Sequence, residues 1–173
     1  GLDYNLMTGQ IPAELGELVN LEILGISNMG FTGTIPAELG DLRNLFYFYV
    51  QSNTLTGTLP SELSRLTSVE FFYVANNMLT GTLPEDLGNM AEIRSFYIDL
   101  NQFSGTVPNE FNNWKSLEIL RLQQNDLTGN VAEVLKDMNF LQNIDMSDNR
   151  FSGRVPTEMF KLPSLLTVAL TEN

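Results

Sequence analysis

The sequence of 173 residues is rich in carboxylates but lacks the residue types that most often act as nucleophiles and general bases. It has 21 Asp and Glu residues against nine Lys and Arg, which gives a net charge of -12, and it contains no histidine and no cysteine. Ser-His and Cys-His nucleophiles and thiolate metal sites are therefore impossible. We expect no catalytic residue, no metal site and no cofactor in this chain.

Two carboxylates, Asp145 and Asp148, are close enough in sequence to be considered as a catalytic pair or a calcium loop. Their spacing does not single out a glycosidase site, and the run that begins at Asp145 lacks the DxDxDG order of a calcium loop. The glycines recur every 24 residues instead of clustering before a helix, so a phosphate-binding loop is absent too. The sequence predicts that the chain is not an enzyme.

The side chains with the clearest binding chemistry are aromatic and recur at the same interval of 24 residues. The candidate ligand-binding residues are Tyr47, Tyr49, Phe71, Tyr73 and Tyr97, with Arg121 and Asp145 at the rim of the patch. Tyrosine offers rigid area and a hydroxyl, which suits a peptide, a protein loop or a glycan ring. Neighbouring aromatics also stabilise a sheet by pairing with one another. We favour binding, because a contiguous exposed aromatic patch usually marks an interaction site.

The interval of 24 residues belongs to an internal repeat that runs along the whole chain. The stretch from Leu45 to Pro60, LFYFYVQSNTLTGTLP, returns as VEFFYVANNMLTGTLP from Val69, and the same register extends back to Leu21 and forward to Asn173. Self-similarity at a fixed period of this length is the signature of a solenoid. The chain is therefore predicted to be an array of coils.

Within each unit the pattern LxxLxLxxN predicts a short strand. The fourth and sixth residues should face inward, in columns that run from Leu24 to Val168 and from Ile26 to Leu170. The third and fifth residues then point outward, and equivalent strands stack in parallel about 4.8 Å apart. This register places the aromatic residues on three adjacent strands, with Arg121 continuing the row.

The ninth position of the unit is an asparagine in seven copies, Asn5, Asn53, Asn77, Asn101, Asn125, Asn149 and Asn173. A short amide at the turn can satisfy backbone groups of its own coil and of the next one, which allows it to be buried. The second unit has Met29 there, preceded by Asn28. Either the ladder is interrupted at Met29 or the chain shifts so that Asn28 takes the role, and we favour interruption.

The rest of the unit predicts a turn and a short helical segment. An invariant glycine, seen for example at Gly57 and Gly81, implies a backbone geometry or a close approach that a Cβ would obstruct. A proline follows, except at Ala132, and opens a short helical or 3₁₀ segment on the outer side of the coil. The single tryptophan, Trp114, falls in an apolar column of this segment, so we predict a structural role for it.

The full unit, LxxLxLxxNxLTGxIPxxLGxL, resembles the plant-type leucine-rich repeat of receptor-kinase ectodomains and polygalacturonase-inhibiting proteins, and the resemblance covers residues 1–173 as a single array of about seven units. It implies an α/β solenoid with a parallel sheet on the concave face, a second short strand near the Thr-Gly segment, and short helical or 3₁₀ segments on the convex side. It also implies recognition rather than catalysis, and an extracellular or cell-surface setting. The sequence departs from the family in lacking cysteine-bearing caps and Asn-x-Ser/Thr sequons, and we expect it to be a segment of a longer protein.

The charge and the apolar pattern limit the partners. An acidic chain is a poor match for nucleic acid and for anionic membranes, and no apolar run is long enough to insert into a bilayer. Acidic residues on the predicted concave side, among them Asp3, Glu70, Asp99 and Glu118, favour a basic peptide or protein ligand. The alternatives are a structural scaffold subunit, a hydrolase inhibitor, or an ice-binding protein that presents the rank of Thr and Ser from Thr8 to Ser152.

Overall fold

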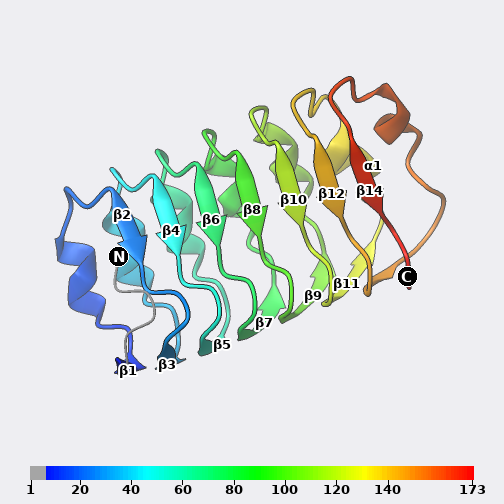
Figure 1. The fold of residues 1–173 in the computed structure, drawn as a ribbon. Coiled ribbons are helices and arrows are strands. Elements are labelled where there is room, and N and C mark those ends of the chain that lie inside the picture. The colour runs from blue at the N-terminus through cyan, green and yellow to red at the C-terminus, as the bar shows by residue number, and fades with distance from the viewer. Residues whose placement is uncertain (1–6) are drawn as a thin grey trace.

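The computed structural model describes residues 7–173, and in it the chain winds into a single row of coils (Figure 1). Each coil adds one strand to a first parallel sheet, one strand to a second parallel sheet and one short helical turn. In Figure 1 the strands of the first sheet lie side by side from β2 to β14, and the helical turns lie behind them. The predicted α/β solenoid is confirmed.

The first sheet, called sheet 1 below, lies on the concave side. It contains β2 (Ile23–Gly25), β4 (Tyr47–Tyr49), β6 (Phe71–Tyr73), β8 (Ser95–Tyr97), β10 (Ile119–Arg121), β12 (Asn143–Asp145) and β14 (Thr167–Ala169). Sheet 2 contains β1 (Thr8–Gln10), β3 (Gly30–Gly33), β5 (Thr54–Gly57), β7 (Met78–Thr82), β9 (Gln102–Thr106), β11 (Asp126–Gly129) and β13 (Arg150–Phe151). Sheet 2 is the second strand that the resemblance implied.

The third layer consists of the convex turns. They are η1 (Ala13–Glu17), η2 (Ala37–Asp41), η3 (Ser61–Arg65), η4 (Glu85–Asn89), η5 (Asn109–Asn113), α1 (Ala132–Leu135) and η6 (Thr157–Lys161). Each 3₁₀ turn follows a proline whose φ lies between -68° and -60°, as the fixed proline ring requires. Ala132 can donate its N–H, to Asn130 Oδ1 at 2.8 Å, and its coil forms the short α-helix instead.

The core runs as a continuous column through the coils because the fourth and sixth residues of each unit face inward. Phe48 pairs with Phe72 and Phe72 with Phe96 across sheet 1, and their rings stack at 4.9 and 5.3 Å between centroids. The columns are buried from β2 to β12. Val168 is in register with the buried Ile144 and continues the same column, although it is 43% exposed on β14, the outermost strand of the sheet.

The ladder asparagines connect successive coils, as the sequence predicts, and those at 53, 77, 101 and 149 are buried. Asn77 Nδ2 donates to the carbonyl oxygens of Val50, Val74 and Ala75 at 3.0 to 3.3 Å, and its Oδ1 accepts from Leu55 N at 3.0 Å. The same pattern recurs at Asn53, Asn101, Asn125, Asn149 and Asn173, whereas Asn5 lies outside the described residues. One side chain thus satisfies backbone groups of two coils.

The ladder is interrupted at the second unit. Met29 occupies the ladder position and is 9% exposed, while Asn28 is exposed and has a φ of 56°. Ser52 and Asn76, which precede the ladder asparagines of the next two coils, have the same left-handed backbone, with φ of 58° and 54°. The register is therefore unchanged, and the favoured prediction of an interruption is confirmed.

The invariant glycine combines both constraints that the sequence suggested. Gly81 has a φ of +83°, and a Cβ built on it would lie 2.7 Å from Cγ2 of Thr58 in the preceding coil. The Thr and Ser residues beside these glycines also join coils, since Thr56 Oγ1 donates to Gly33 O at 3.2 Å and Thr80 Oγ1 to Gly57 O at 3.3 Å. The regular rank of hydroxyls thus has a structural task.

Trp114 is also structural, as predicted. It is fully buried, its Nε1 donates to Leu87 O at 3.1 Å, and its ring stacks on Phe111 at 4.0 Å. The fixed coil geometry leaves the outward residues of sheet 1 as the positions that can vary with a ligand.

Candidate functional site

The aromatic residues singled out by the sequence lie on adjacent strands of sheet 1. Register places Tyr49 beside Tyr73 and Tyr73 beside Tyr97. Arg121 and Asp145 follow in the same row on β10 and β12, and Tyr47 pairs with Phe71 in the row alongside. We call these seven residues the concave row. Sequence reasoning therefore placed all of them together correctly.

The rings of the concave row form two stacks that run along the solenoid axis. Tyr49 lies 4.8 Å from Tyr73 and Tyr73 lies 4.2 Å from Tyr97, with interplanar angles of 22° and 13°. Tyr47 stacks on Phe71 at 5.0 Å. Because the ring faces contact one another, the edges and hydroxyls are the parts that remain for another molecule.

The rings are partly buried, neither turned into the core nor fully exposed. The pKa of the Tyr73 phenol is raised to about 12, chiefly by burial and also by the phenols of Tyr97 and Tyr49, while a hydrogen bond with Ser95 opposes the rise. Burial also raises the pKa of Tyr49, with a contribution from Tyr47. Both phenols therefore stay neutral at physiological pH and can donate and accept hydrogen bonds.

The two rim residues have different roles. The guanidinium of Arg121 lies over the Tyr97 ring, 4.9 Å from its centroid, which is a cation–π arrangement. The carboxylate of Asp145 accepts from Ser147 N at 3.0 Å and from Ser147 Oγ at 2.6 Å. Arg121 extends the aromatic stack, while Asp145 fixes the turn after its own strand.

Charges on the concave side are less free than the sequence suggested. Arg94 bridges Glu70 and Glu118 of the two neighbouring coils, with contacts of 3.0 Å to each. This pair of bridges reduces the acidic surface at the edge of the concave row. Asp3, which the sequence assigned to the same surface, lies outside the described residues.

Asp99 is the main correction to the expected surface. It was assigned to the exposed acidic residues, but it is only 7% exposed, and its Oδ1 has no hydrogen-bond partner among residues 7–173. Burial raises the pKa of the Asp99 carboxyl, its own backbone N–H and Arg121 lower it, and Asp145 raises it again. A buried carboxylate with one oxygen unpaired is unfavourable unless a partner is supplied.

Two glutamines share the position of Asp99 in other coils. The Oε1 atoms of Gln51 and Gln123 are also buried without a hydrogen-bond partner in the described part of the chain. Sequence reasoning missed this row of acceptors because it considered the seventh position only for exposed charges, as at Asp99, and did not consider the glutamines there. The signal was present in the polar residues that recur at the seventh position.

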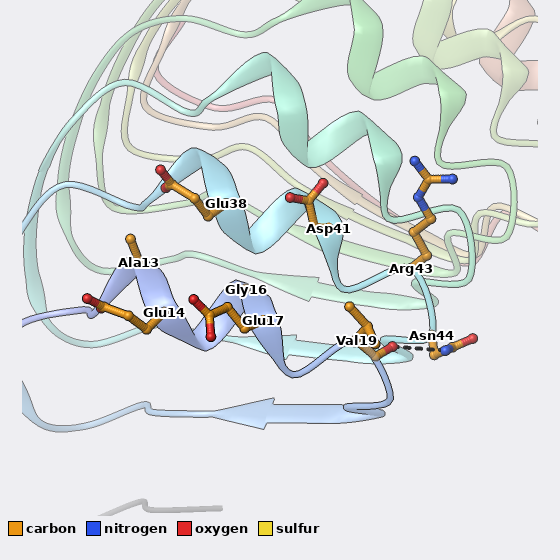
Figure 2. A pocket seen from close by; sticks show the side chains of 9 residues that line it. All are labelled: Ala13, Glu14, Gly16, Glu17, Val19, Glu38, Asp41, Arg43 and Asn44. Carbon is orange, nitrogen blue, oxygen red and sulfur yellow. Dashed lines mark hydrogen bonds between the residues drawn. The ribbon is translucent and has the colours of Figure 1, made fainter.

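A depression of about 700 Å³ lies on the convex side, far from the concave row in the layer order (Figure 2). Its lining includes Glu14, Glu17, Glu38 and Asp41, and Figure 2 shows these carboxylates on two adjacent helical turns, with Arg43 beyond them. The two turns are packed so closely that only glycine fits at position 16, because a Cβ on Gly16 would lie 2.3 Å from Glu38 O. The depression is thus a consequence of how the convex turns stack on one another. We therefore place the candidate site on the concave row.

Within residues 7–173 no cluster of acidic side chains has the arrangement of a metal site, and no helix there is long and apolar enough to cross a membrane. The concave row offers neutral phenols and one stacked guanidinium, and the seventh position of the unit beside it offers buried acceptors. These groups suit hydrogen bonding and stacking with another molecule.

Comparison with known proteins connects this geometry to a family. The family profile described as Leucine Rich Repeat matches residues 20–42, 44–66, 68–90 and 140–162. No curated protein sequence matches the chain significantly.

Solved structures of receptor ectodomains are similar over almost the whole chain. The ectodomain of the Arabidopsis thaliana receptor kinase GASSHO1/SCHENGEN3, in complex with CASPARIAN STRIP INTEGRITY FACTOR 2, is 34% identical with a TM-score of 0.95, over 97% of this chain and 20% of that one. A TDR receptor is 30% identical with a TM-score of 0.95, over 99% of this chain and 30% of that one. The Arabidopsis receptor kinase HAESA, in complex with the peptide hormone IDA and the co-receptor SERK1, is 27% identical with a TM-score of 0.94, over 99% and 29%.

The chain thus spans less than a third of the length of each of these receptors. The matched repeats cover more than half of it, and their plant-type unit is the one that builds sheet 1, the asparagine ladder and the Thr-Gly turns. The chain belongs to the leucine-rich repeat family, with repeats of the plant type.

Proposed function

We propose that this chain is a non-catalytic recognition segment that binds a peptide or protein through the concave row, as part of a longer extracellular or cell-surface protein. The observation that carries the proposal is the pair of aromatic stacks on the outward face of sheet 1. Their side chains have no packing duty inside the coil, and they present hydroxyls and ring edges together. The receptors GASSHO1/SCHENGEN3 and HAESA, whose structures contain peptide or factor partners, support a ligand of this class.

The charge of the chain favours a basic ligand. Its net charge is -12, and the seventh position of the unit carries side-chain oxygens without a donor among residues 7–173, at Gln51, Asp99 and Gln123. A basic peptide would be attracted at long range and then held by short-range contacts. Peptide hormones and basic loops of protein partners both fit this description.

The test begins with the selection of binding peptides from a random displayed library against the immobilised chain. Binding of the selected peptides is then compared between the wild type and the double variant Tyr49→Ala, Tyr73→Ala. We expect a loss of about 2 kcal/mol or more, close to thirtyfold, because the stack of Tyr49, Tyr73 and Tyr97 loses two of its three rings.

A matched control removes two aromatics elsewhere. Phe140 and Phe160 are 61% and 80% exposed and lie outside both sheets, so Phe140→Ala with Phe160→Ala should leave the affinity unchanged. Circular dichroism of all variants verifies folding. Equal affinity of the wild type and the tyrosine double variant would contradict the proposal.

A further inference from the structure

The acceptor atoms beside the concave row point to a specific ligand group. Asp99 follows β8, and its Oδ1 is buried with no donor among residues 7–173. In the next coil, Gln123 has a buried Oε1 in the same condition. Two adjacent coils thus each hold one unpaired side-chain oxygen at the seventh position of the unit, on backbones about 4.8 Å apart along the solenoid axis.

The charges around these acceptors leave a net negative site. Arg121 is near enough to lower the pKa of Asp99, but its guanidinium lies over the Tyr97 ring and forms no hydrogen bond with the buried Oδ1. Asp145 is engaged by Ser147. One cation faces two carboxylates, so an additional positive group would be favoured.

The residues next to Asp99 are apolar. In the coil before Asp99, the equivalent position is Ala75, which has no polar side-chain atom to offer. The residue after Asp99 is Leu100, which is 45% exposed and has a left-handed φ of 56°. The equivalent position is polar in the neighbouring coils, as at Asn76 and Gln124. A buried carboxylate with one unpaired oxygen and an exposed leucine in this conformation are both locally unfavourable, and such conflicts concentrate at functional sites.

We propose that Asp99 and Gln123 bind the guanidinium group of an arginine side chain supplied by the peptide ligand. The inference rests on the proposed function and identifies one ligand residue of the same face. A guanidinium carries five N–H donors in a planar fork, so it can donate to acceptors on two neighbouring coils. Leu100 would contact the aliphatic stem of that arginine.

The experiment uses N-acetyl-arginine N-methylamide as the probe and the citrulline analogue as its neutral isostere. Each is titrated into the wild-type chain and followed by NMR through the backbone amides of Asp99 and Gln123. We expect saturable shifts with the arginine probe and binding of the citrulline analogue weaker by roughly tenfold or more, because a charge-assisted hydrogen bond is lost. This comparison requires no variant.

Two variants locate the interaction. Asp99→Asn keeps the shape of the side chain and should weaken arginine binding by roughly tenfold. Asp148→Asn is the matched control, because Asp148 is a partly buried carboxylate of the same side that is already bonded to Gln124, and it should leave arginine binding unchanged.

Equal binding of the two probes, shifts confined to the acidic residues of the convex turns, or an undiminished affinity of Asp99→Asn would each overturn the inference. The proposed function has a separate readout. If library peptides require Tyr49 and Tyr73 but the arginine probe ignores Asp99, only the arginine site is wrong. If the arginine probe requires Asp99 but library peptides ignore the tyrosines, the concave row is wrong and the acceptor site remains.

Discussion

At the scale of single residues, side chains of the concave row can both stabilise the surface and offer groups for binding. Tyr73 stacks on both neighbouring tyrosines, and its phenol is neutral at physiological pH because its pKa is raised to about 12. It therefore holds the surface in shape and offers a neutral hydroxyl at the same time. Asp99 does not stabilise the surface in this way, since its buried Oδ1 has no hydrogen-bond partner among residues 7–173.

Asp99→Asn should therefore stabilise the fold while it weakens binding. Burial raises the Asp99 pKa above its ordinary value of 3.8, so the folded state retains a proton that the unfolded state has lost, and stability falls as the pH rises through the interval between the two pKa values. At neutral pH the variant should gain roughly 1 kcal/mol, or about 2–4 °C in Tm. Below pH 3.8 the gain should shrink toward zero.

Thermal unfolding of the two proteins across this pH range measures the difference directly. Other titrating groups are shared by both chains and cancel in the comparison. A variant that is less stable than the wild type at neutral pH would show that the Asp99 carboxylate has a stabilising partner.

At the scale of the repeated element, the asparagine ladder is what makes each coil a rigid support. Asn77→Ala would remove three donated bonds and one accepted bond at once and leave buried backbone groups unpaired. We expect a loss of about 2–5 kcal/mol in the free energy of unfolding, measured by urea denaturation. Asn113→Ala, at an exposed asparagine of η5, should change it by less than about 0.5 kcal/mol. Similar losses of unfolding free energy in both variants would contradict a special stabilising role for the asparagine ladder.

The element scale also shows why the fold could be predicted and part of the site could not. Strand register follows from the alternation of apolar residues. The sequence of one unit therefore predicts both the buried columns through Phe48 and Val50 and the outward row through Tyr49. The burial of Asp99 does not follow from its position in the unit, because Gln51 and Gln123 hold the same position and are only partly buried. Sequence spacing contains no such information, and the residue was predicted to be an exposed charge.

Departures from the unit needed the backbone as well. Met29 was predicted to interrupt the ladder, but only the left-handed φ of Asn28 excludes a shift of register. At Ala132 a missing proline was visible in the sequence, while the conversion of a 3₁₀ turn into α1 was not. The bridge of Arg94 to Glu70 and Glu118 likewise requires three coils in space.

At the scale of the whole molecule, the net charge of -12 should act on the rate of encounter. For an arginine-containing library peptide, the association rate constant should fall by roughly threefold or more as salt shortens the screening length from about 10 Å at 0.1 M to about 3 Å at 1 M. The dissociation rate constant should change much less. Surface plasmon resonance with the citrulline form of the same peptide is the control, and a salt response equal to that of the arginine form would argue against long-range attraction.

The most direct test of the central claim is to place a photo-crosslinking benzoylphenylalanine at one position at a time and expose each variant to a selected peptide. In place of Tyr49 or Tyr97 the probe lies on the concave row, whereas in place of Thr58 or Thr106 it follows or ends a strand of sheet 2. The account predicts crosslinks to the peptide from the two tyrosine positions and none from the two threonine positions. Crosslinks from sheet 2 alone would contradict it.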